Sequence, residues 1–465
     1  MPLRFPEIED SADKIHNTSL SLLKDPGIRI EHEGILNLLL ANGAKAGLKS
    51  GVVQLPGDMV EECIALCPRR FALTDRRGEG AFLAAGGPPV FWSVPGMALY
   101  RKGQHRPFLS SDMADLARLL DQLDNVHGIF GMAMEDVPPP ARDVVGLKIM
   151  AENSGKHIRV LCFSPEGADA LVEMKQVVGA HSWFSIGFTA HGPLRWTHLA
   201  LDIFERTSGA GIPVTVNGEP MAGVSGPVTL AGTAAVGNAE ILAGIVVNQL
   251  LEPGRPCIYN LGLAHVFDMR TAIAVTGAPE NALLAQISSA MGHFYNLPSA
   301  SWVSTESMCP DSQAALEKMF GFYTHMAGGV TNIWGVGQLE SELTISTAQA
   351  VIDNEMISIA RRFERGVQFN DASLALDVIR AVGNAGSFLE TAHTLENYRS
   401  EFFFPSILCR VRRAGWVAEG QKRLDQKAEE VADRLIANSV ENYLSGEQIR
   451  ELEAIASRHV SAVSS

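Results

Sequence analysis

The chain has 465 residues, of which 46% are hydrophobic and 19% are charged, so it can bury a large core and is typical of a folded globular protein. Its formal net charge of −14 and the lack of any Lys/Arg run argue against a nucleic acid as partner. No apolar run reaches the roughly 18 to 20 residues of a membrane helix, and the N-terminus lacks a signal-peptide pattern. We therefore expect a cytoplasmic protein without a membrane partner.

The first 86 residues predict helices joined by short connectors. Residues 10–30 carry apolar side chains at helical spacing, with Asp10 or Ser11 as the cap. A second helix begins near Pro56 and stops before Pro68. The Gly/Pro cluster at 84–90 marks a boundary, so residues 1–86 are expected to form an N-terminal helical extension.

Residues 87–365 alternate between short apolar or β-branched runs and longer amphipathic ones. The expected strands cover 90–94, 126–132, 157–163, 183–188, 213–217, 256–262, 301–305 and 329–335. Eight strands alternating with helices predict an α/β fold, a TIM (β/α)8 barrel. A doubly wound open sheet is the alternative, but no complete G-x-G-x-x-G follows any strand. Residues 366–465 are helical and more charged, which predicts a C-terminal helical extension packed on the barrel or on another subunit.

Several chemistries lack their usual residues. The 13 histidines form no HxH, HExxH or HxxxH pair. Cys63 and Cys67 are four residues apart but lack a second pair, so we predict no metal site. The chain has no G-x-S-x-G motif and no phosphate-binding loop, and no lysine ends a predicted strand, which argues against a Schiff base.

The active site of a TIM barrel lies at the C-terminal ends of its strands. In this chain those ends are rich in aromatic side chains and carboxylates: Phe188, His191, Glu219, Tyr259, His265, Trp302, Ser304, Thr305, Glu306 and Trp334. Aromatic faces with anionic groups suit a cation that cannot donate hydrogen bonds, such as quaternary ammonium, at about 0.5–2 kcal/mol per ring. Each aromatic residue could instead belong to the core, and each histidine could be a scaffold residue.

Four stretches spread along most of the chain are distinctive: "ALCPRRFALTDRRG", "NGEPMAGVSGPVTLAGTAAVGNAEILAGIVVNQLLEPGRPCIY", "PDSQAALEKM" and "LTISTAQAVIDNEMISIARRFERGV". They resemble the trimethylamine:corrinoid methyltransferase superfamily. The similarity runs from about residue 10 to about residue 435, with the motifs in matching order. The resemblance implies a TIM barrel with helical extensions at both ends. It also implies transfer of a methyl group from a methylated amine to the Co(I) of a separate, small corrinoid-binding protein.

The resemblance also places the active site. Archaeal founders of the superfamily carry a pyrrolysine near the end of the seventh strand, and that place falls at or near Ser304 and Thr305. Here the residues are ordinary ones, so the chain looks like the non-pyrrolysine branch, whose members act on quaternary amines such as glycine betaine. The family often reads Asp-Ser-Lys before Pro-Asp-x-Gln, whereas this chain has Glu306-Ser307-Met308 and lacks that fixed cation.

The expected function is therefore a corrinoid-dependent methyltransferase for a small quaternary amine. Trp302, Trp334, Tyr259 and Phe188 would hold the cation, Glu306 or Glu219 would be its counter-charge, and His191, His265 or Arg270 would hold a substrate carboxylate. Ser304, Thr305 and Glu306 would form the catalytic strand end. The alternatives are a betaine-binding regulatory barrel that has lost catalysis and a methyltransferase with another acceptor. A homo-oligomer is expected from the size of the helical extensions.

Overall fold

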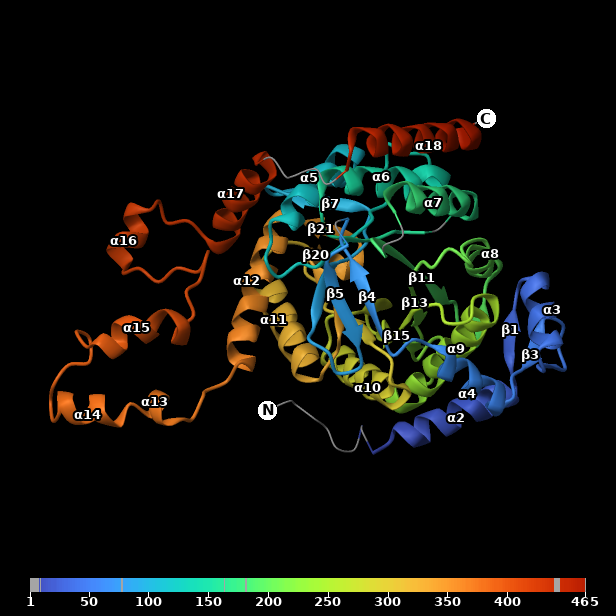
Figure 1. The fold of residues 1–465 in the computed structure, drawn as a ribbon, viewed down its shortest axis with the longest axis horizontal. Helices are drawn as coiled ribbons and strands as arrows, with labels where there is room; N and C mark the ends of the chain where they lie inside the picture. The colour runs from blue at the N-terminus through green and yellow to red at the C-terminus, as the bar shows by residue number, and fades with distance from the viewer. Residues whose placement is uncertain are drawn as a thin grey trace.

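Eight parallel strands close into a barrel in the order of the chain (Figure 1). The computed structural model describes residues 8, 10–76, 78–162, 164–179, 182–438 and 444–464. The barrel strands are β6 (Val90–Ser93), β9 (Gly128–Phe130), β10 (His157–Arg159), β11 (Phe184–Ala190), β13 (Val214–Gly218), β15 (Cys257–Gly262), β18 (Ser299–Trp302) and β19 (Asn332–Val336). Each overlaps one of the predicted strands, so the predicted TIM barrel is confirmed.

Helices follow the strands and surround the barrel. They are α5 (Ser110–Asp121), α6 (Arg142–Asn153), α7 (Pro165–Val178), α8 (His198–Arg206), α9 (Leu230–Leu251), α10 (Pro279–Tyr295), α11 (Ser312–Ala327) and α12 (Thr347–Glu364). Several begin at a side-chain cap: Asp311 accepts a hydrogen bond from the backbone N–H of Ala314 at 3.0 Å, and Ser346 accepts one from Gln349 at 3.3 Å. These caps fix where the βα loops end and the helices start.

One helix in the described part of the chain, α9, is long and apolar enough to cross a membrane by length and composition. Of its most apolar window, 78% is buried inside the protein. It packs against the barrel strand β13 and against two helices of the N-terminal extension, α2 (Ala12–Lys24) and α4 (Gly57–Leu66). Burial on nearly all sides explains why this helix has no polar face.

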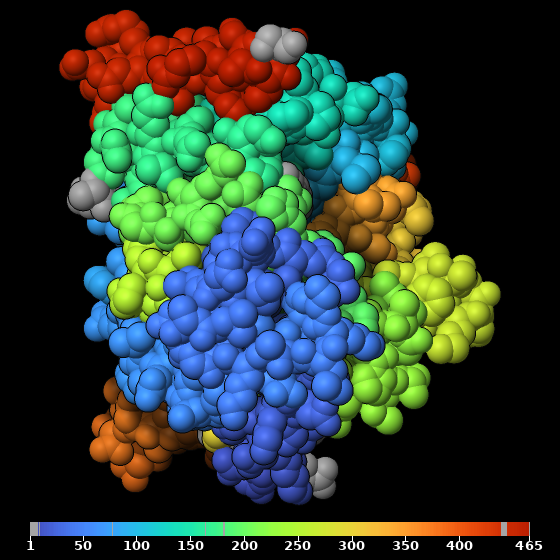
Figure 2. Space-filling view, turned by 90° about the vertical axis from the view of Figure 1, so that its right-hand side faces the viewer, coloured from blue at the N-terminus to red at the C-terminus, as the bar shows by residue number. Residues whose placement is uncertain are grey.

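The N-terminal extension contains strands as well as helices, so the prediction of a purely helical segment is wrong. Besides α2, α4 and α3 (Glu33–Ala41), it has β1 (Ile28–Ile30), β2 (Lys45–Ala46), β3 (Val52–Gln54) and the hairpin β4 (Arg70–Thr74) and β5 (Gly80–Ala84). β1 pairs with β12 (Arg195–Trp196), and the hairpin meets the N-terminal end of the barrel, where His157 Nδ1 lies 3.0 Å from the Thr74 carbonyl oxygen. Figure 2 shows this extension as a continuous blue layer over one face.

Two small sheets rise from the C-terminal ends of the barrel strands. One joins β14 (Met221–Ala222), β16 (His265–Asp268) and β17 (Ile273–Val275), which follow β13 and β15. The other joins β20 (Gln338–Leu339), β21 (Thr344–Ser346), β7 (Ala98–Arg101) and β8 (Gln104–Pro107), which follow β19 and β6. Together they wall the mouth of the barrel at the end where TIM-barrel active sites lie.

The C-terminal extension is helical, as predicted, but only part of it packs on the barrel. α17 (Leu424–Ala437) lies against α12 and α5, and α18 (Gly446–Ser464) lies across α6 and α7. Residues 366–423, here called the arm, project away from the barrel (Figure 1). The helices of the arm, α13 (Asp371–Leu374), α14 (Leu376–Val382), α15 (Ala392–Glu401) and α16 (Arg413–Ala418), bury no side chain.

Candidate active site

A row of tryptophans lines the inside of the barrel below its mouth. Trp302, Trp334 and Trp92 are partners in register on three neighbouring strands, so their side chains share the inner face. The rings of Trp92 and Trp334 lie parallel, 6.2 Å apart, and Phe130 meets Trp334 edge-on at 5.2 Å. The indole N–H groups of Trp302 and Trp334 are buried without a hydrogen-bond partner. Buried donors without partners indicate a place where a ligand or water binds.

Arg159 ends β10 and points into the barrel beside these rings. Its guanidinium carbon lies 5.0 Å from the centre of the Phe130 ring and 5.9 Å from that of Trp334. A Cβ atom at Gly187 would collide with Nη2, so glycine leaves the room that this side chain occupies. Burial lowers the pKa of Arg159 to about 9, which keeps it protonated at neutral pH.

Two carboxyl groups meet at the mouth. Glu219 directly follows β13, and Glu342 lies in the loop between β19 and α12. Burial raises the pKa of Glu219 to about 7 and raises the pKa of Glu342 well above its usual range. The charge of Glu219 raises the pKa of Glu342 further, whereas no cation of the described chain lies close enough to lower either value. Both shifts disfavour two negative charges side by side, so a cationic ligand would stabilise the ionised carboxyl pair.

The backbone that carries Glu342 is strained. Glu340, Ser341 and Glu342 all have positive φ values, of 53°, 49° and 83°. Three consecutive non-glycine residues in the left-handed region cost free energy, which the surrounding structure has to offset. Strain of this kind clusters at functional sites, so it supports a functional role for the turn.

A buried ion pair anchors the start of the same loop. Lys318 of α11 donates to the carbonyl oxygens of Gly335 and Gln338 at 2.8 and 2.9 Å and contacts Asp353 of α12 at 2.6 Å. Asp353 also accepts a hydrogen bond from the backbone N–H of Gly337 at 2.7 Å. Both charged side chains are fully buried. The pair ties the loop to two helices and so fixes the path that leads to Glu342.

The strand end formed by Ser304, Thr305 and Glu306 is engaged in local hydrogen bonds. Glu306 Oε1 accepts from the backbone N–H groups of Thr276 and Gly277 at 2.6 and 2.9 Å. Thr305 donates to Glu317 at 2.5 Å, and Ser304 hydrogen-bonds with the Thr276 hydroxyl. These contacts clip the loop before α10 to the end of β18. The predicted catalytic strand end thus makes local hydrogen bonds in this structure, whereas the side chains of Glu219 and Glu342 have no ion pair or hydrogen bond within the described residues.

Two predicted aromatic ligands point out of the barrel. The Tyr259 hydroxyl donates to Asn238 of α9 at 2.8 Å, which places its ring among the helices. The ring of Phe188 stacks on Phe204 of α8 with centres 3.5 Å apart. Both residues lie at strand positions whose side chains alternate to the outer face, so the structure does not support the prediction that they hold the cation.

The three residues predicted to hold a carboxylate are dispersed. Arg270 is on the surface, with its side chain 89% exposed, and pairs with Asp268 at 3.1 Å. His191 is exposed, and its Nδ1 lies 3.1 Å from the Thr189 carbonyl oxygen. His265 alone is buried near the site, with its ring centre 6.3 Å from that of Trp302, and burial lowers its pKa. Arg159 and Glu342 are the residues of this candidate site that the sequence analysis did not predict.

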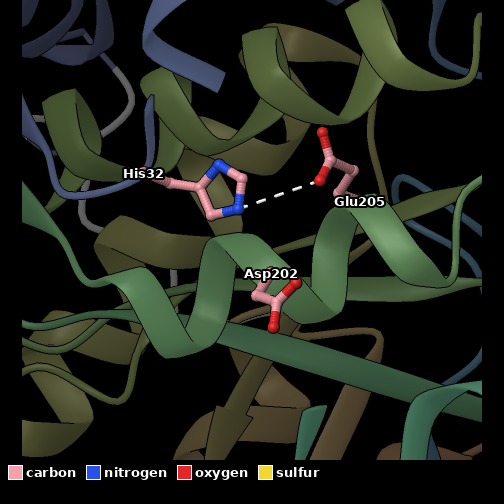
Figure 3. Close-up of side chains that lie close together, drawn as sticks. All are labelled: His32, Asp202 and Glu205. Carbon is pink, nitrogen blue, oxygen red and sulfur yellow. Dashed lines mark ion pairs between the residues drawn. The ribbon is translucent and has the colours of Figure 1, made fainter. Parts of the chain in front are cut away.

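Among the residues that the structure describes, one cluster of possible metal ligands lies outside the barrel mouth, where His32 faces Asp202 and Glu205 of α8 (Figure 3). His32 Nδ1 accepts a hydrogen bond from the backbone N–H of Ile35 at 3.3 Å, so its proton sits on Nε2 in the neutral ring. His32 Nε2 lies 3.8 Å from Glu205 Oε2, and Asp202 pairs with Arg206 at 3.0 Å. The cluster is a cap and an ion-pair network that joins the N-terminal extension to α8.

The closed barrel, with a guanidinium, indoles and carboxyl groups at the C-terminal ends of its strands, defines a TIM-barrel enzyme. The family model described as trimethylamine methyltransferase (MTTB) matches residues 5–463. The chain therefore belongs to the trimethylamine methyltransferase family, and it is a methyltransferase.

Curated relatives and a solved structure agree with this assignment. The chain is 30% identical to a trimethylamine methyltransferase of Desulfitobacterium hafniense, covering 91% of this chain and 88% of the relative. It is also 30% identical to a glycine betaine methyltransferase of another strain of that species, covering 96% and 95%. The crystal structure of the Methanosarcina barkeri monomethylamine methyltransferase matches with a TM-score of 0.57 and 12% identity, over 93% of this chain and 88% of that one. That likeness concerns the fold.

Proposed function

We propose that this methyltransferase moves a methyl group from a small quaternary amine, such as glycine betaine, to the Co(I) of a corrinoid bound by a separate small protein. The observation that carries the proposal is the carboxyl pair, Glu219 and Glu342, which no described cation neutralises. Indole faces and a nearby negative charge are what a quaternary ammonium group requires, because it cannot donate hydrogen bonds. The family supports methyl transfer, and one relative is named a glycine betaine methyltransferase.

The chemistry of methyl transfer favours a quaternary amine as the methyl donor. The electron pair of Co(I) forms the new bond to the methyl carbon, while the C–N bond breaks and its electron pair stays on nitrogen. A neutral tertiary amine leaves, so no acid has to protonate the nitrogen in the transition state. The protein then has to hold the methyl carbon in line with the acceptor and exclude water, which is the work of a rigid, aromatic and charged site.

The methyl acceptor would dock over the barrel mouth. Large apolar side chains are exposed in five loops that follow barrel strands: Met97, Val224, Val228, Met269, Ile273, Met308 and Leu343, here called the rim residues. Contiguous patches of exposed apolar side chains mark protein-interaction surfaces, and we propose that the rim residues form such a patch. A partner seated on the rim residues would deliver its corrinoid directly above the carboxyl pair.

A single change at the rim should weaken the partner and leave the amine unaffected. Met308→Asp should raise the KM for the unmethylated acceptor protein by about five- to thirtyfold, the effect of about 1–2 kcal/mol at an interface. The KM for the amine should stay within about twofold. Steady-state kinetics with varied acceptor measures this, and Leu48→Asp, a change at a fully exposed leucine of the N-terminal extension, is the control. Equal effects of the two changes would place the docking surface elsewhere.

Binding of the amine should strengthen as the pH rises through about 7. The cation requires an ionised carboxyl pair, and the pKa of Glu219 in the empty site is about 7. Below that pH the dissociation constant should rise about tenfold per pH unit for each proton displaced. Calorimetric titration with tetramethylammonium, which has no titrating group, measures the profile. Glu219→Gln should bind weakly at every pH, and an unchanged slope in that variant would remove the carboxyl pair as the cause.

The decisive assay combines the protein, reduced cobalamin or a corrinoid protein, and a panel of amines. The optical change that accompanies methylation of Co(I) reports transfer. Turnover with glycine betaine or a related quaternary amine, and not with trimethylamine, is the expected result. Turnover with trimethylamine alone would overturn the proposed substrate class, and silence across the panel with every acceptor would overturn methyl transfer itself.

We also propose a cytoplasmic homo-oligomer. The six cysteines are free, as in a reducing compartment. The arm exposes large apolar side chains, including Phe369 at 82% and Leu389 at 80%, and its helices bury none. Helices without a buried face are marginal in water, so the arm requires a covering surface, which a second copy would supply.

A further inference from the structure

Arg76, Arg159 and Arg255 are the buried arginines of the described chain, and the two that lie at the barrel, Arg159 and Arg255, differ in their hydrogen-bond partners. Arg255 donates to the carbonyl oxygen of Ile212 at 2.9 Å, to Thr207 at 3.0 Å and to Phe204 at 3.5 Å, and it lies 3.5 Å from Glu252. The hydrogen bonds and the ion pair occupy the guanidinium of Arg255, so this arginine has a structural role. A buried arginine with a structural role needs partners of this kind for its donors and its charge.

Arg159 has almost none of these partners. Nη1 donates to the Val160 carbonyl oxygen at 2.8 Å, and Nε is buried without a hydrogen bond. No carboxylate of the described chain lies close enough to raise its pKa, which burial lowers to about 9. A buried cation with unused donors is costly unless an anion joins it, so the arrangement is explained by a ligand.

The setting selects the kind of anion. Arg159 ends a barrel strand and faces inward, where the rings of Phe130 and Trp334 flank the guanidinium at 5.0 and 5.9 Å. A guanidinium matches the two oxygens of a carboxylate, and a planar carboxylate can lie in the plane of the guanidinium between such rings. Gly187 provides the space, because a side chain there would displace Nη2.

The carboxyl pair and this cation come from different parts of the barrel. Arg159 ends β10, whereas Glu219 follows β13, two strands further round, and no ion pair within the described chain joins Arg159 to Glu219 or Glu342. Two opposite, separated charges inside one barrel mouth match a molecule that carries the complementary charges at its two ends. A quaternary amine that also bears a carboxylate has that form.

We infer that Arg159 is the anion subsite of the barrel and binds the carboxylate of a zwitterionic methyl donor whose ammonium end faces Glu219 and Glu342. This inference rests on the proposed function for the ammonium end and adds the residue that selects betaines over quaternary amines without a carboxylate. The tertiary amine product keeps its carboxylate, so Arg159 would hold the molecule through the transfer while the cationic end loses its charge.

The test compares glycine betaine with choline, which has the same trimethylammonium head and a hydroxyl in place of the carboxylate. Binding to the intact chain is followed by tryptophan fluorescence, to which Trp334 beside Arg159 should contribute, and by calorimetry. The wild-type protein should bind glycine betaine about tenfold to 100-fold more tightly than choline, the range for hydrogen bonds to a charged group. Arg159→Met should erase this preference and leave the affinity for choline unchanged, and Arg159→Lys should keep part of it.

The outcomes separate the two proposals. Equal affinity for glycine betaine and choline in the wild type, or an equal loss of both in folded Arg159→Met and Arg159→Lys, would overturn the anion subsite. The thermal midpoints of the variants show whether they are folded. Methyl transfer is measured independently, so selective binding without transfer would refute the proposed reaction and leave the subsite standing. Methyl transfer from both ligands with no dependence on Arg159 would refute the anion subsite and leave the proposed reaction standing.

Discussion

Glu219→Gln should lower kcat/KM for the quaternary amine by roughly 30-fold to 1,000-fold, because removing one partner of a buried charge pair costs about 2–5 kcal/mol. Burial raises the pKa of Glu219 to about 7, so part of the carboxyl is ionised at neutral pH and becomes fully so when a cation binds beside it. Glutamine keeps the shape and removes that charge. Initial rates of methyl transfer at about pH 8 with varied amine measure the effect.

Glu135→Gln is the matched control for this change. Glu135 also belongs to a loop that follows a barrel strand, but its side chain is 70% exposed and its ion pair with Arg142 is long, at 3.8 Å. Its replacement should leave kcat/KM within about twofold, as exposed pairs contribute little. A similar loss in both variants would mean that total charge, and not the carboxyl pair, governs the rate.

Lys318→Met should lower the free energy of unfolding by about 3–5 kcal/mol, because it leaves the carboxylate of Asp353 buried without its cation. The side chains of Lys318 and Asp353 are both fully buried. The lysine also donates hydrogen bonds to two carbonyl oxygens at the start of the loop that leads to Glu342. The variant should therefore lose activity as well as stability. Urea unfolding of variant and wild type measures the change.

The double variant Lys318→Met/Asp353→Leu tests the cause. Replacing both charges by apolar side chains removes the unpaired carboxylate, so much of the lost stability should return. Activity should return less completely, because the loop still lacks the contacts to Gly335 and Gly337. A double variant that is as unstable as the single one would show that packing, and not the unpaired charge, is responsible.

The barrel could be predicted because its signals are local. Each strand is a short apolar or β-branched run, and the helices between them repeat with helical spacing over a dozen residues or more. The strands of the N-terminal extension could not be predicted in the same way. β1 has three residues, and its partners are β3 on one side and Arg195 and Trp196, far away in the chain, on the other.

The site was harder to predict because a side chain's direction depends on register. Tyr259 and Phe188 do lie near the ends of barrel strands, but a shift of one position sends a side chain to the opposite face. Glu306 was selected for its place after β18, and its partner Thr276 lies 30 residues earlier, which no local pattern reveals. Arg159 could not be recognised as a strand-end residue because the expected strand continued to residue 163, whereas β10 ends at Arg159.

The arm also sets an order of events for the newly made chain. Every barrel strand and α12 precede residue 366, so the barrel has all its strands before the arm is synthesised. In the arm Ile407 is buried but the helices bury no side chain, and under the proposed assembly these helices are covered only when a second copy arrives. Until that encounter, apolar side chains such as Phe369 and Leu389 are exposed to proteases and chaperones. Quality control in the cell would then recognise an unassembled subunit by its arm, while its barrel is already complete.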